Sequence, residues 1–274
     1  MKQQTVEIQG QPIAYLETPG GRDSPAVIFV HGNSSSARTW LPVLEGPFGQ
    51  RFRCLALDLP GHGQSSPARD QADYSLPGYA AVLGGFAGAL GAADAVVVGW
   101  SLGGHIALEA APGLPEAAGF VIFGTPPVGS AAQLADAFQP NEAMNAGYSA
   151  SVSEAEAQAY AATFTAPGSA LPASAFVPDI LATDGAARAG LLASIGEGRF
   201  ADQVAIAAGL RQPLAVLHGT GEQLVRLDYL RELDLPTLWH GAVQLVPGAG
   251  HALHQEAPQQ FTALLADFST ELGR

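Results

Sequence analysis

Residues 95–103 of this 274-residue chain read AVVVGWSLG and combine a strand signal with a catalytic motif. The apolar run 95–98 predicts a strand that is buried on both faces. It leads directly into G-x-S-x-G, which is followed by apolar residues at helical spacing, namely Leu102, Ile106 and Ala110. Between a strand and a helix, this motif forms a sharp turn that strains the serine backbone and exposes its hydroxyl. Ser101 is therefore the predicted nucleophile, whereas outside that setting the same motif would indicate an ordinary glycine-rich loop.

Further apolar runs and helical spacings repeat this strand-then-helix pattern along the chain. Short runs bounded by glycine, proline or charged residues predict strands at 26–30, 54–57, 120–123 and 214–217. Apolar residues at i, i+3, i+4 and i+7 predict helices over 79–90 and 261–272. Because strands alternate with helices, we expect the α/β class, with a mostly parallel, doubly wound sheet. Segments 5–8 and 13–16 predict an antiparallel hairpin at its edge.

One long stretch breaks this alternation, because no strand is predicted between about 128 and 212. Ser153-Glu154-Ala155-Glu156 within it matches a helix capping box, and the residues that follow suit a helix through about Phe164. We therefore expect a core domain formed by 1–127 and 213–274. A helical cap, 128–212, is expected to be inserted before the penultimate strands.

The composition limits the classes of partner and site. The net charge of −13 disfavours nucleic acid and anionic membranes as partners. Cys54 is the only cysteine, so no disulfide can form within the chain, and its apolar neighbours predict a buried structural residue. The N-terminus lacks an apolar signal core, and no apolar run approaches the ~20 residues that span a bilayer. We expect a cytoplasmic protein, and its oligomeric state is left open.

A serine nucleophile needs a general base, and a histidine near the C-terminal end of the chain is the first candidate. The segment GAGH (248–251) precedes the last predicted helix, which places His251 on a loop where this chemistry requires a base. His254 is the rival, but it would lie further from the tip of that loop. Structural or surface roles are expected for the other five histidines, which are His31, His62, His105, His218 and His240.

The base in turn needs a carboxylate that orients it. The predicted strand 214–217 runs into Gly219-Thr220-Gly221-Glu222, so Glu222 would lie at the same edge of the sheet as Ser101. Asp228 is the runner-up, but it falls too far beyond the strand. The end of the preceding strand reads FGTPP (123–127) and offers no carboxylate.

An acyl-transfer site also needs two N–H donors for the oxyanion. One is expected from Leu102, the residue after the nucleophile, and the other from Asn33, which follows His31-Gly32 at the end of an early strand. A second loop, DLPGHG (58–63), also follows a strand. There we expect Asp58 and His62 to stabilise a turn and not to take part in catalysis.

At these residues the chain resembles the α/β-hydrolase superfamily, whose signatures appear as HGNSSS (31–36), DLPGHGQS (58–65), GWSLGGH (99–105) and GAGHALHQEAP (248–258). A narrower resemblance is to the serine-dependent N-acyl-homoserine lactonases, which are quorum-quenching hydrolases. It is carried by HGNSSS, LEGPFG, GWSLGGHI, FGTPPV, TDGAAR and the segment 222–251. This resemblance implies a glutamate as the acid and places Asn33 and the cap residue Tyr160 near the bound lactone.

The cap pattern is compatible with a lipophilic substrate. Tyr160 and Phe164 lie one helical turn apart and are predicted to bind substrate, with Tyr160 bonding a carbonyl. The same residues could instead attach the cap to the core. Nearby apolar side chains that could hold an acyl chain are Phe138, Leu171, Phe176 and Ile180.

The resemblance implies a serine hydrolase that opens the lactone ring of N-acyl-homoserine lactones through an acyl-enzyme on Ser101. It implies no metal and no cofactor, and the expected partner is a small-molecule ester or lactone. A general carboxylesterase would use the same triad and stays open as an alternative. A ligand receptor on the same fold would bind without turnover, although an intact triad disfavours that reading.

Overall fold

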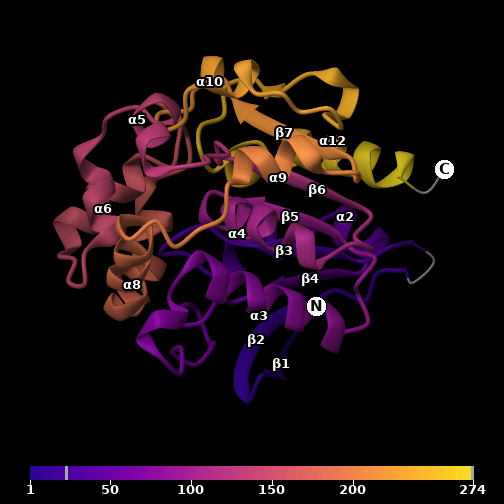
Figure 1. Ribbon diagram of the computed structural model, residues 1–274, viewed down its shortest axis with the longest axis horizontal. Helices are drawn as coiled ribbons and strands as arrows, with labels where there is room; N and C mark the ends of the chain where they lie inside the picture. The colour runs from indigo at the N-terminus through magenta and orange to yellow at the C-terminus, as the bar shows by residue number, and fades with distance from the viewer. Residues whose placement is uncertain (22–23, 273–274) are drawn as a thin grey trace.

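A computed structural model describes residues 1–21 and 24–272 of the chain. Eight strands form one sheet in the order β1-β2-β4-β3-β5-β6-β7-β8 (Figure 1). The pairs β1–β2 and β2–β4 are antiparallel, and the remaining neighbours run parallel. The strands are β1 (Lys2–Ile8), β2 (Gln11–Glu17), β3 (Val27–Val30), β4 (Cys54–Leu57), β5 (Val96–Trp100), β6 (Gly119–Phe123), β7 (Leu214–Gly219) and β8 (Gln244–Val246).

This architecture confirms the expected fold class. The five parallel strands predicted from apolar runs correspond to β3 to β7, and all of their residues are buried. The predicted hairpin is the antiparallel pair β1–β2. Strand β8 was not predicted, because it has three residues and only Val246 among them is buried.

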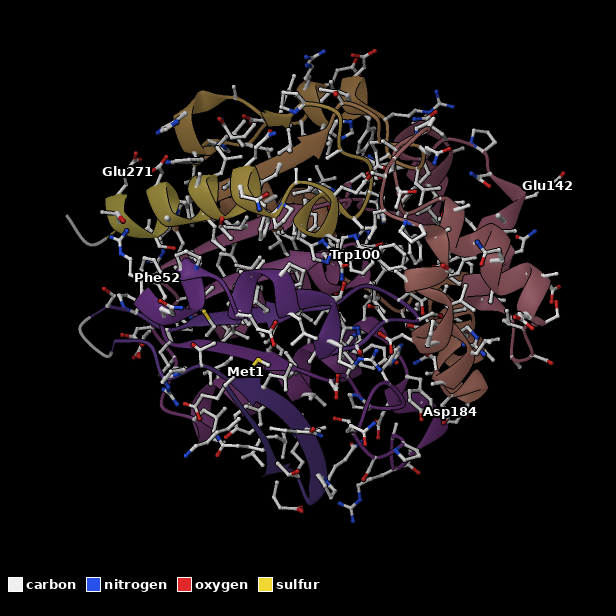
Figure 2. The ribbon with its side chains drawn as sticks, turned by 180° about the vertical axis from the view of Figure 1, so that it is seen from behind. Met1, Phe52, Trp100, Glu142, Asp184 and Glu271 are labelled. Carbon is white, nitrogen blue, oxygen red and sulfur yellow. The ribbon has the colours of Figure 1, made fainter. Side chains whose placement is uncertain are left out.

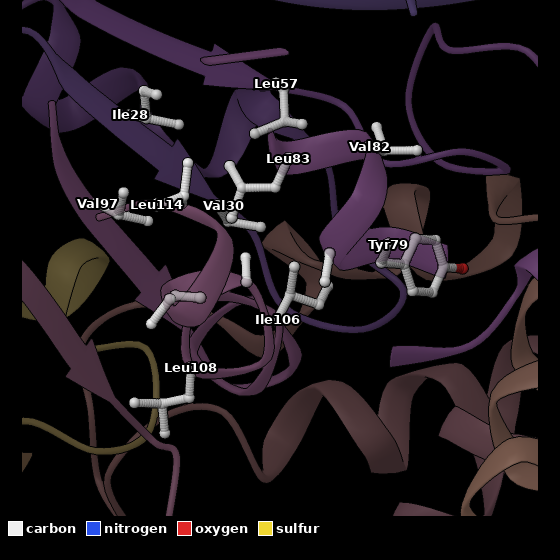
Figure 3. Close-up of a cluster of buried hydrophobic side chains, with 14 of the residues drawn as sticks. Ile28, Val30, Leu57, Tyr79, Val82, Leu83, Val97, Ile106, Leu108 and Leu114 are labelled. Atoms are coloured by element: carbon white, nitrogen blue, oxygen red, sulfur yellow. The ribbon is translucent and has the colours of Figure 1, made fainter. Parts of the chain in front are cut away.

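Helices cover both faces of the sheet, as a doubly wound topology requires. On one face α3 (Leu76–Ala89) and α4 (Leu102–Ala110) pack against β3, β4 and β5. Figure 3 shows this cluster, in which Val30 and Leu57 of the strands meet Leu83 and Ile106 of the helices. On the other face lie α1 (Leu41–Leu44), α2 (Pro47–Arg51), α11 (Leu253–Glu256) and α12 (Pro258–Glu271).

Between β6 and β7 the chain is helical, and no residue of 128–212 belongs to a named strand. The predicted capping box is present, because Ser153 Oγ accepts from the Glu156 N–H and the Glu156 carboxylate accepts from the Ser153 N–H. Figure 1 shows α5, α6 and α8 together at one end of the sheet. The helices are α5 (Leu134–Ala137), α6 (Glu154–Ala162), α7 (Val177–Ala182), α8 (Gly185–Gly196) and α9 (Gln203–Gly209), with α10 (Leu227–Glu232) after β7. The division into core and cap stays a prediction.

Short 3-10 helices lie in the connections between these elements. One of them, η5, is the longest and contributes Met144 and Tyr148 to the wall of the site described below. Their bounds are η1 (Ala37–Trp40), η2 (Gln71–Asp73), η3 (Ala111–Gly113), η4 (Ala131–Gln133), η5 (Glu142–Tyr148), η6 (Ala173–Ala175) and η7 (Trp239–Gly241). Over the described residues, no helix has the length and apolar character needed to cross a bilayer.

Two further expectations concern residues beside the sheet. Asp58 stabilises the turn after β4, because its carboxylate accepts from the N–H groups of Ala37 and Gln64 at 2.6 and 2.9 Å. Cys54 is buried in β4, and burial raises the pKa of its thiol to about 12, so the thiolate is not formed at neutral pH.

Candidate active site

Ser101 occupies a tight turn between β5 and α4, at the carboxyl end of the sheet. Its backbone has φ +53° and ψ −118°, a conformation that costs a non-glycine residue roughly 1–3 kcal/mol. The turn is anchored by the Ser101 N–H, which donates to the Phe123 carbonyl at 2.9 Å. The second motif glycine is sterically required, since a Cβ on Gly103 would lie 2.1 Å from the Val30 carbonyl oxygen. The backbone strain predicted from the motif is therefore present.

The two predicted oxyanion donors flank this turn. Leu102 is the first residue of α4, so its N–H has no acceptor within the helix. Asn33 lies just beyond β3, where its N–H makes no backbone hydrogen bond to the described part of the chain. Both residues line the same pocket as Ser101. Two residues whose N–H groups make no backbone hydrogen bond within the described part of the chain therefore line the pocket that contains the hydroxyl.

Glu222 and His251 form a buried pair behind this pocket. His251 Nδ1 lies 2.9 Å from Glu222 Oε2, and the two side chains are only 2% and 1% exposed. Glu222 Oε1 accepts from the Leu224 N–H at 2.8 Å. Burial alone would raise the pKa of Glu222, but the charge and hydrogen bond of His251, with the Leu224 N–H, hold that pKa below its ordinary value. Glu222 is thus an ionised carboxylate that orients His251.

The loop carrying His251 is fixed by contacts that the sequence did not reveal. The Trp100 indole donates to the His251 carbonyl at 2.9 Å. Glu256 accepts from the N–H groups of Gly250 at 2.6 Å and of Ala166 at 2.9 Å, and so connects this loop to the 128–212 segment. Glu256 was overlooked although it lies within the quoted signature, because spacing alone gives it no role.

The structure separates the two rival residues from the site. His254 is fully buried on the far side of Trp100, where its Nε2 lies 2.8 Å from Thr39 Oγ1. Asp228 is a surface residue, since its side chain is 89% exposed and faces Arg231. Neither residue lines the pocket that contains Ser101.

Ser101 and His251 open into one pocket that encloses about 700 Å³, its open mouth included. Its polar lining comes from Asn33, Ser101, His105, Tyr148, Tyr160 and His251. Most of the remaining wall is apolar and is formed by Leu76, Leu102, Val128, Leu134, Phe138, Met144, Leu191, Ile195, Phe200 and Leu224. The predicted residues Asn33, Ser101, Leu102, Tyr160 and His251 are therefore brought together around one space.

Tyr160 and Asn33 lie close to each other in this wall. Asn33 Nδ2 donates to the Gly147 carbonyl at 2.5 Å, and a Cβ on Gly147 would lie 2.6 Å from the Tyr160 hydroxyl. Burial raises the pKa of Tyr160 well above its ordinary value, so the hydroxyl keeps its proton. This hydroxyl has no partner among the described side chains and backbone groups, which leaves it free to donate into the pocket.

Phe164 does not line the pocket, although it was predicted to bind substrate. Its ring packs behind Tyr160 and against Trp100, with centroid separations of 4.7 and 5.4 Å. It also stacks on the His251 ring at 6.0 Å, with the two planes inclined by 29°. The prediction of which apolar side chains hold an acyl chain is also only partly confirmed. Phe138 lines the pocket, whereas Leu171, Phe176 and Ile180 belong to an interior cluster because that face of the segment packs against other helices.

His105 lines the pocket, a position that the expected structural role did not include. It lies on α4, and its Nδ1 is 2.7 Å from Gln203 Oε1. A signal was available, because His105 falls in the first turn of the helix that was predicted to follow Ser101. Within 1–21 and 24–272, no cluster of three or more His, Cys, Asp or Glu is arranged to hold a metal ion.

Comparison with known proteins gives a consistent result over almost the whole chain. A sequence model of the Alpha/beta hydrolase family matches residues 27–264. Two solved structures of the N-acyl homoserine lactonase AidH are similar to this chain with a TM-score of 0.93 and 36% identity. They cover 99% of this chain and 98% and 97% of their own. One is a mutant complexed with N-hexanoyl homoserine lactone, and the other is complexed with N-butanoyl homoserine.

Curated relatives match over shorter stretches. The dihydrolipoyllysine-residue acetyltransferase component of the acetoin cleaving system of Cupriavidus necator is 35% identical over 113 residues, which are 41% of this chain and 29% of that protein. A biotin biosynthesis bifunctional protein, BioHC of Cellvibrio japonicus, is 29% identical over 262 residues, 91% of this chain and 48% of that protein. The chain thus spans less than half the length of these relatives.

Proposed function

Because this chain belongs to the alpha/beta hydrolase family, we propose that it is a serine hydrolase that opens the lactone ring of N-acyl-homoserine lactones. The observation that carries the proposal is the shared pocket of Ser101 and His251, with Glu222 bonded behind the imidazole. The largely apolar wall suits an acyl chain, and the similarity to AidH supports a homoserine lactone as the substrate.

In the first step Ser101 attacks the lactone carbonyl. Glu222 holds the His251 Nδ1–H, which leaves Nε2 unprotonated and able to take the Ser101 proton. The carbonyl carbon becomes tetrahedral, and its oxyanion accepts from the N–H groups of Asn33 and Leu102. In sites of this type each such donor lowers the barrier by about 2.7–4 kcal/mol.

Collapse of that intermediate breaks the ring carbon–oxygen bond, and His251 returns its proton to the leaving alkoxide. The alcohol stays attached through the ring carbons, so the acyl-enzyme holds an opened chain. Water then attacks the ester with His251 again as the base, and Ser101 leaves with the proton. The product is one N-acyl-homoserine, and no cofactor enters the balance.

The polar groups opposite the nucleophile would hold the amide part of the substrate. The Tyr160 hydroxyl keeps its proton and has a free donor, so it can bind a carbonyl oxygen. The Asn33 amide stays bonded to Gly147, which fixes the backbone N–H of the same residue in place. The acyl chain would extend along the wall formed by Leu134, Phe138 and Phe200.

A substrate panel tests this proposal against a simple carboxylesterase. We expect kcat/KM for N-hexanoyl- and N-octanoyl-homoserine lactone to exceed that for nitrophenyl esters of the same acyl length. Preference for the nitrophenyl esters by a large factor would overturn the lactonase reading and leave an esterase.

A second experiment tests the nucleophile and excludes a non-catalytic receptor. A fluorophosphonate probe should label the protein, and Ser101→Ala should abolish both labelling and turnover without changing the circular dichroism spectrum. Ser174→Ala removes an exposed serine and serves as the control. Absence of labelling in the unmodified protein, or turnover by Ser101→Ala, would contradict the assignment.

A further inference from the structure

His105 is a polar residue in the otherwise apolar part of the pocket. It lies in the first turn of α4, directly after the turn that presents Ser101, and its N–H donates to the Ser101 carbonyl at 3.2 Å. The neighbouring wall is apolar, with the Phe138 ring centroid 6.4 Å from the imidazole centroid. An acyl chain leaving the reacting carbonyl would therefore pass the imidazole edge.

One nitrogen of His105 is already engaged. Its Nδ1 lies 2.7 Å from Gln203 Oε1, and Gln203 is fully buried at the start of α9. The other nitrogen, Nε2, has no hydrogen-bond partner within the described part of the chain. Since the ring lines the pocket, Nε2 is the atom that remains to meet a ligand.

Glu109 fixes the orientation of the Gln203 amide. Both Glu109 carboxylate oxygens accept from the Ala201 N–H, at 3.0 and 2.9 Å. Burial raises the pKa of Glu109, and the Ala201 N–H and the Gln203 side chain oppose that shift. Gln203 Nε2 has no hydrogen-bond partner among the described residues. The Gln203 side chain nevertheless helps to hold down the pKa of Glu109, so the amide nitrogen, not the oxygen, is the end that suits the carboxylate. If the Gln203 amide were flipped, its oxygen would face the carboxylate oxygens of Glu109, and the two groups would repel each other.

This chain of contacts determines the tautomer of His105. Because Gln203 presents its oxygen, Nδ1 must carry the proton and donate it, and Nε2 is left as a lone-pair acceptor. Burial also lowers the pKa of His105 to about 4, so the ring is neutral at pH 7. The pocket thus offers a hydrogen-bond acceptor, not a donor, beside the path of the acyl chain.

We propose that His105 Nε2 selects substrates whose acyl chain carries a hydroxyl group near the reacting end, as in 3-hydroxyacyl homoserine lactones. This inference rests on the proposed lactonase function and deepens it. A hydroxyl can donate to Nε2, whereas a keto oxygen at the same carbon has no proton to offer. An unsubstituted chain leaves the buried acceptor without a partner, which is unfavourable.

The test compares N-octanoyl-, N-(3-hydroxyoctanoyl)- and N-(3-oxooctanoyl)-homoserine lactone as substrates of the unmodified enzyme and of His105→Phe. We expect kcat/KM of the enzyme to favour the hydroxy substrate over the other two by roughly tenfold, and the ratio to fall to about one in His105→Phe. Phe138→Leu is the matched control, because it alters the neighbouring wall and should change the three rates in parallel.

A spectroscopic readout separates recognition from a structural role. In nitrogen-15 spectra of histidine-labelled protein, the signal lost in His105→Phe should report a neutral ring protonated at Nδ1. Adding the hydroxy substrate to the Ser101→Ala variant should shift its Nε2 resonance, and the unsubstituted lactone should not.

Three results would overturn the inference: equal rates with all three lactones, preference for the keto substrate, or an unchanged ratio in His105→Phe. Failure of the proposed function looks different, because then none of the lactones is hydrolysed. In that case the same comparison between nitrophenyl octanoate and nitrophenyl 3-hydroxyoctanoate decides the role of His105.

Discussion

The indole Nε1–H of Trp100 donates a 2.9 Å hydrogen bond to the main-chain carbonyl of His251. Trp100 directly precedes Ser101, so this bond connects the strand that ends in the nucleophile to the loop that carries the base. Both residues are at most 2% exposed, and Figure 2 shows Trp100 in the interior of the molecule. The variable position of G-x-S-x-G thus helps to set the separation between hydroxyl and imidazole.

Trp100→Phe should lower kcat and destabilise the fold. The substitution keeps an aromatic ring but leaves a buried carbonyl without its donor, which costs about 1–3 kcal/mol. We expect kcat/KM to fall about tenfold in a steady-state assay. Trp239→Phe is the control, because that indole bonds Glu271 at 2.8 Å, outside the pocket. Equal losses of activity in the two variants would contradict a positioning role for Trp100.

Glu222→Gln should reduce kcat by about a thousand- to ten-thousandfold with little change in the fold. The amide can donate to Nδ1, which would favour the tautomer with a proton on Nε2, where the base must be free. Fluorophosphonate labelling should slow in parallel with turnover. Asp228→Asn removes the exposed rival acid and should keep full activity. If both variants were equally active, another carboxylate would have to orient His251.

Gly124→Ala should lower kcat by pushing the imidazole out of position. Gly124 has φ +60°, and a Cβ there would lie 2.6 Å from His251 Cε1. Gly168→Ala is a matched control, because it places a side chain at φ +79° with no atom within 4 Å. Both variants should lose similar stability in urea unfolding, and only Gly124→Ala should lose activity. An active Gly124→Ala enzyme would show that His251 tolerates displacement.

Stability should fall as the pH drops below about 6.5, because several histidines are buried in neutral form. Burial lowers the pKa of His31 to about 3 and of His62 to about 4, and that of His254 well below its ordinary value. Between about pH 6.5 and 4 the unfolded chain therefore binds protons that the folded chain does not. For each such histidine, the free energy of unfolding should fall by up to about 1.4 kcal/mol for each pH unit of acidification. Urea unfolding at pH 7.5, 6 and 5 measures the slope.

His62→Asn tests the contribution of one group to that slope. The amide can keep the bond to the Pro60 carbonyl that His62 Nδ1 makes at 3.0 Å, but it does not titrate. The free energy of unfolding should then depend less steeply on pH, by up to about 1.4 kcal/mol per unit. His240→Asn makes the same substitution at a half-exposed histidine and serves as the control for the substitution itself. An unaltered slope in His62→Asn would assign the acid sensitivity to other groups.

The elements that the sequence predicted well are those whose residues are buried on both sides. The runs that became β3, β5 and β6 have no exposed residue, so hydrophobicity alone marks them. Glu222 was found by topology, because a residue that follows a parallel strand must lie at the same edge as Ser101. Strand β8 carried no such signal, since it pairs only with β7 at the edge of the sheet.

The contacts that sequence reasoning missed depend on tertiary packing between distant segments. The orientation of His105 is set by Gln203, which reaches it from another helix 98 residues away. Tyr160 and Phe164 were interpreted as one face of a helix that continues through about Phe164, but α6 ends at Ala162. Tyr160 therefore lines the pocket, whereas Phe164 packs behind it. Sequence spacing predicts a helix but not the residue at which it ends.

The carboxylate of Glu256 holds the Gly250 N–H with one oxygen and the Ala166 N–H with the other. Whatever lifts the 128–212 helices away from the sheet must first release this clamp, and the release frees the loop next to His251. One side chain therefore ties the position of the loop that carries His251 to the position of the 128–212 segment.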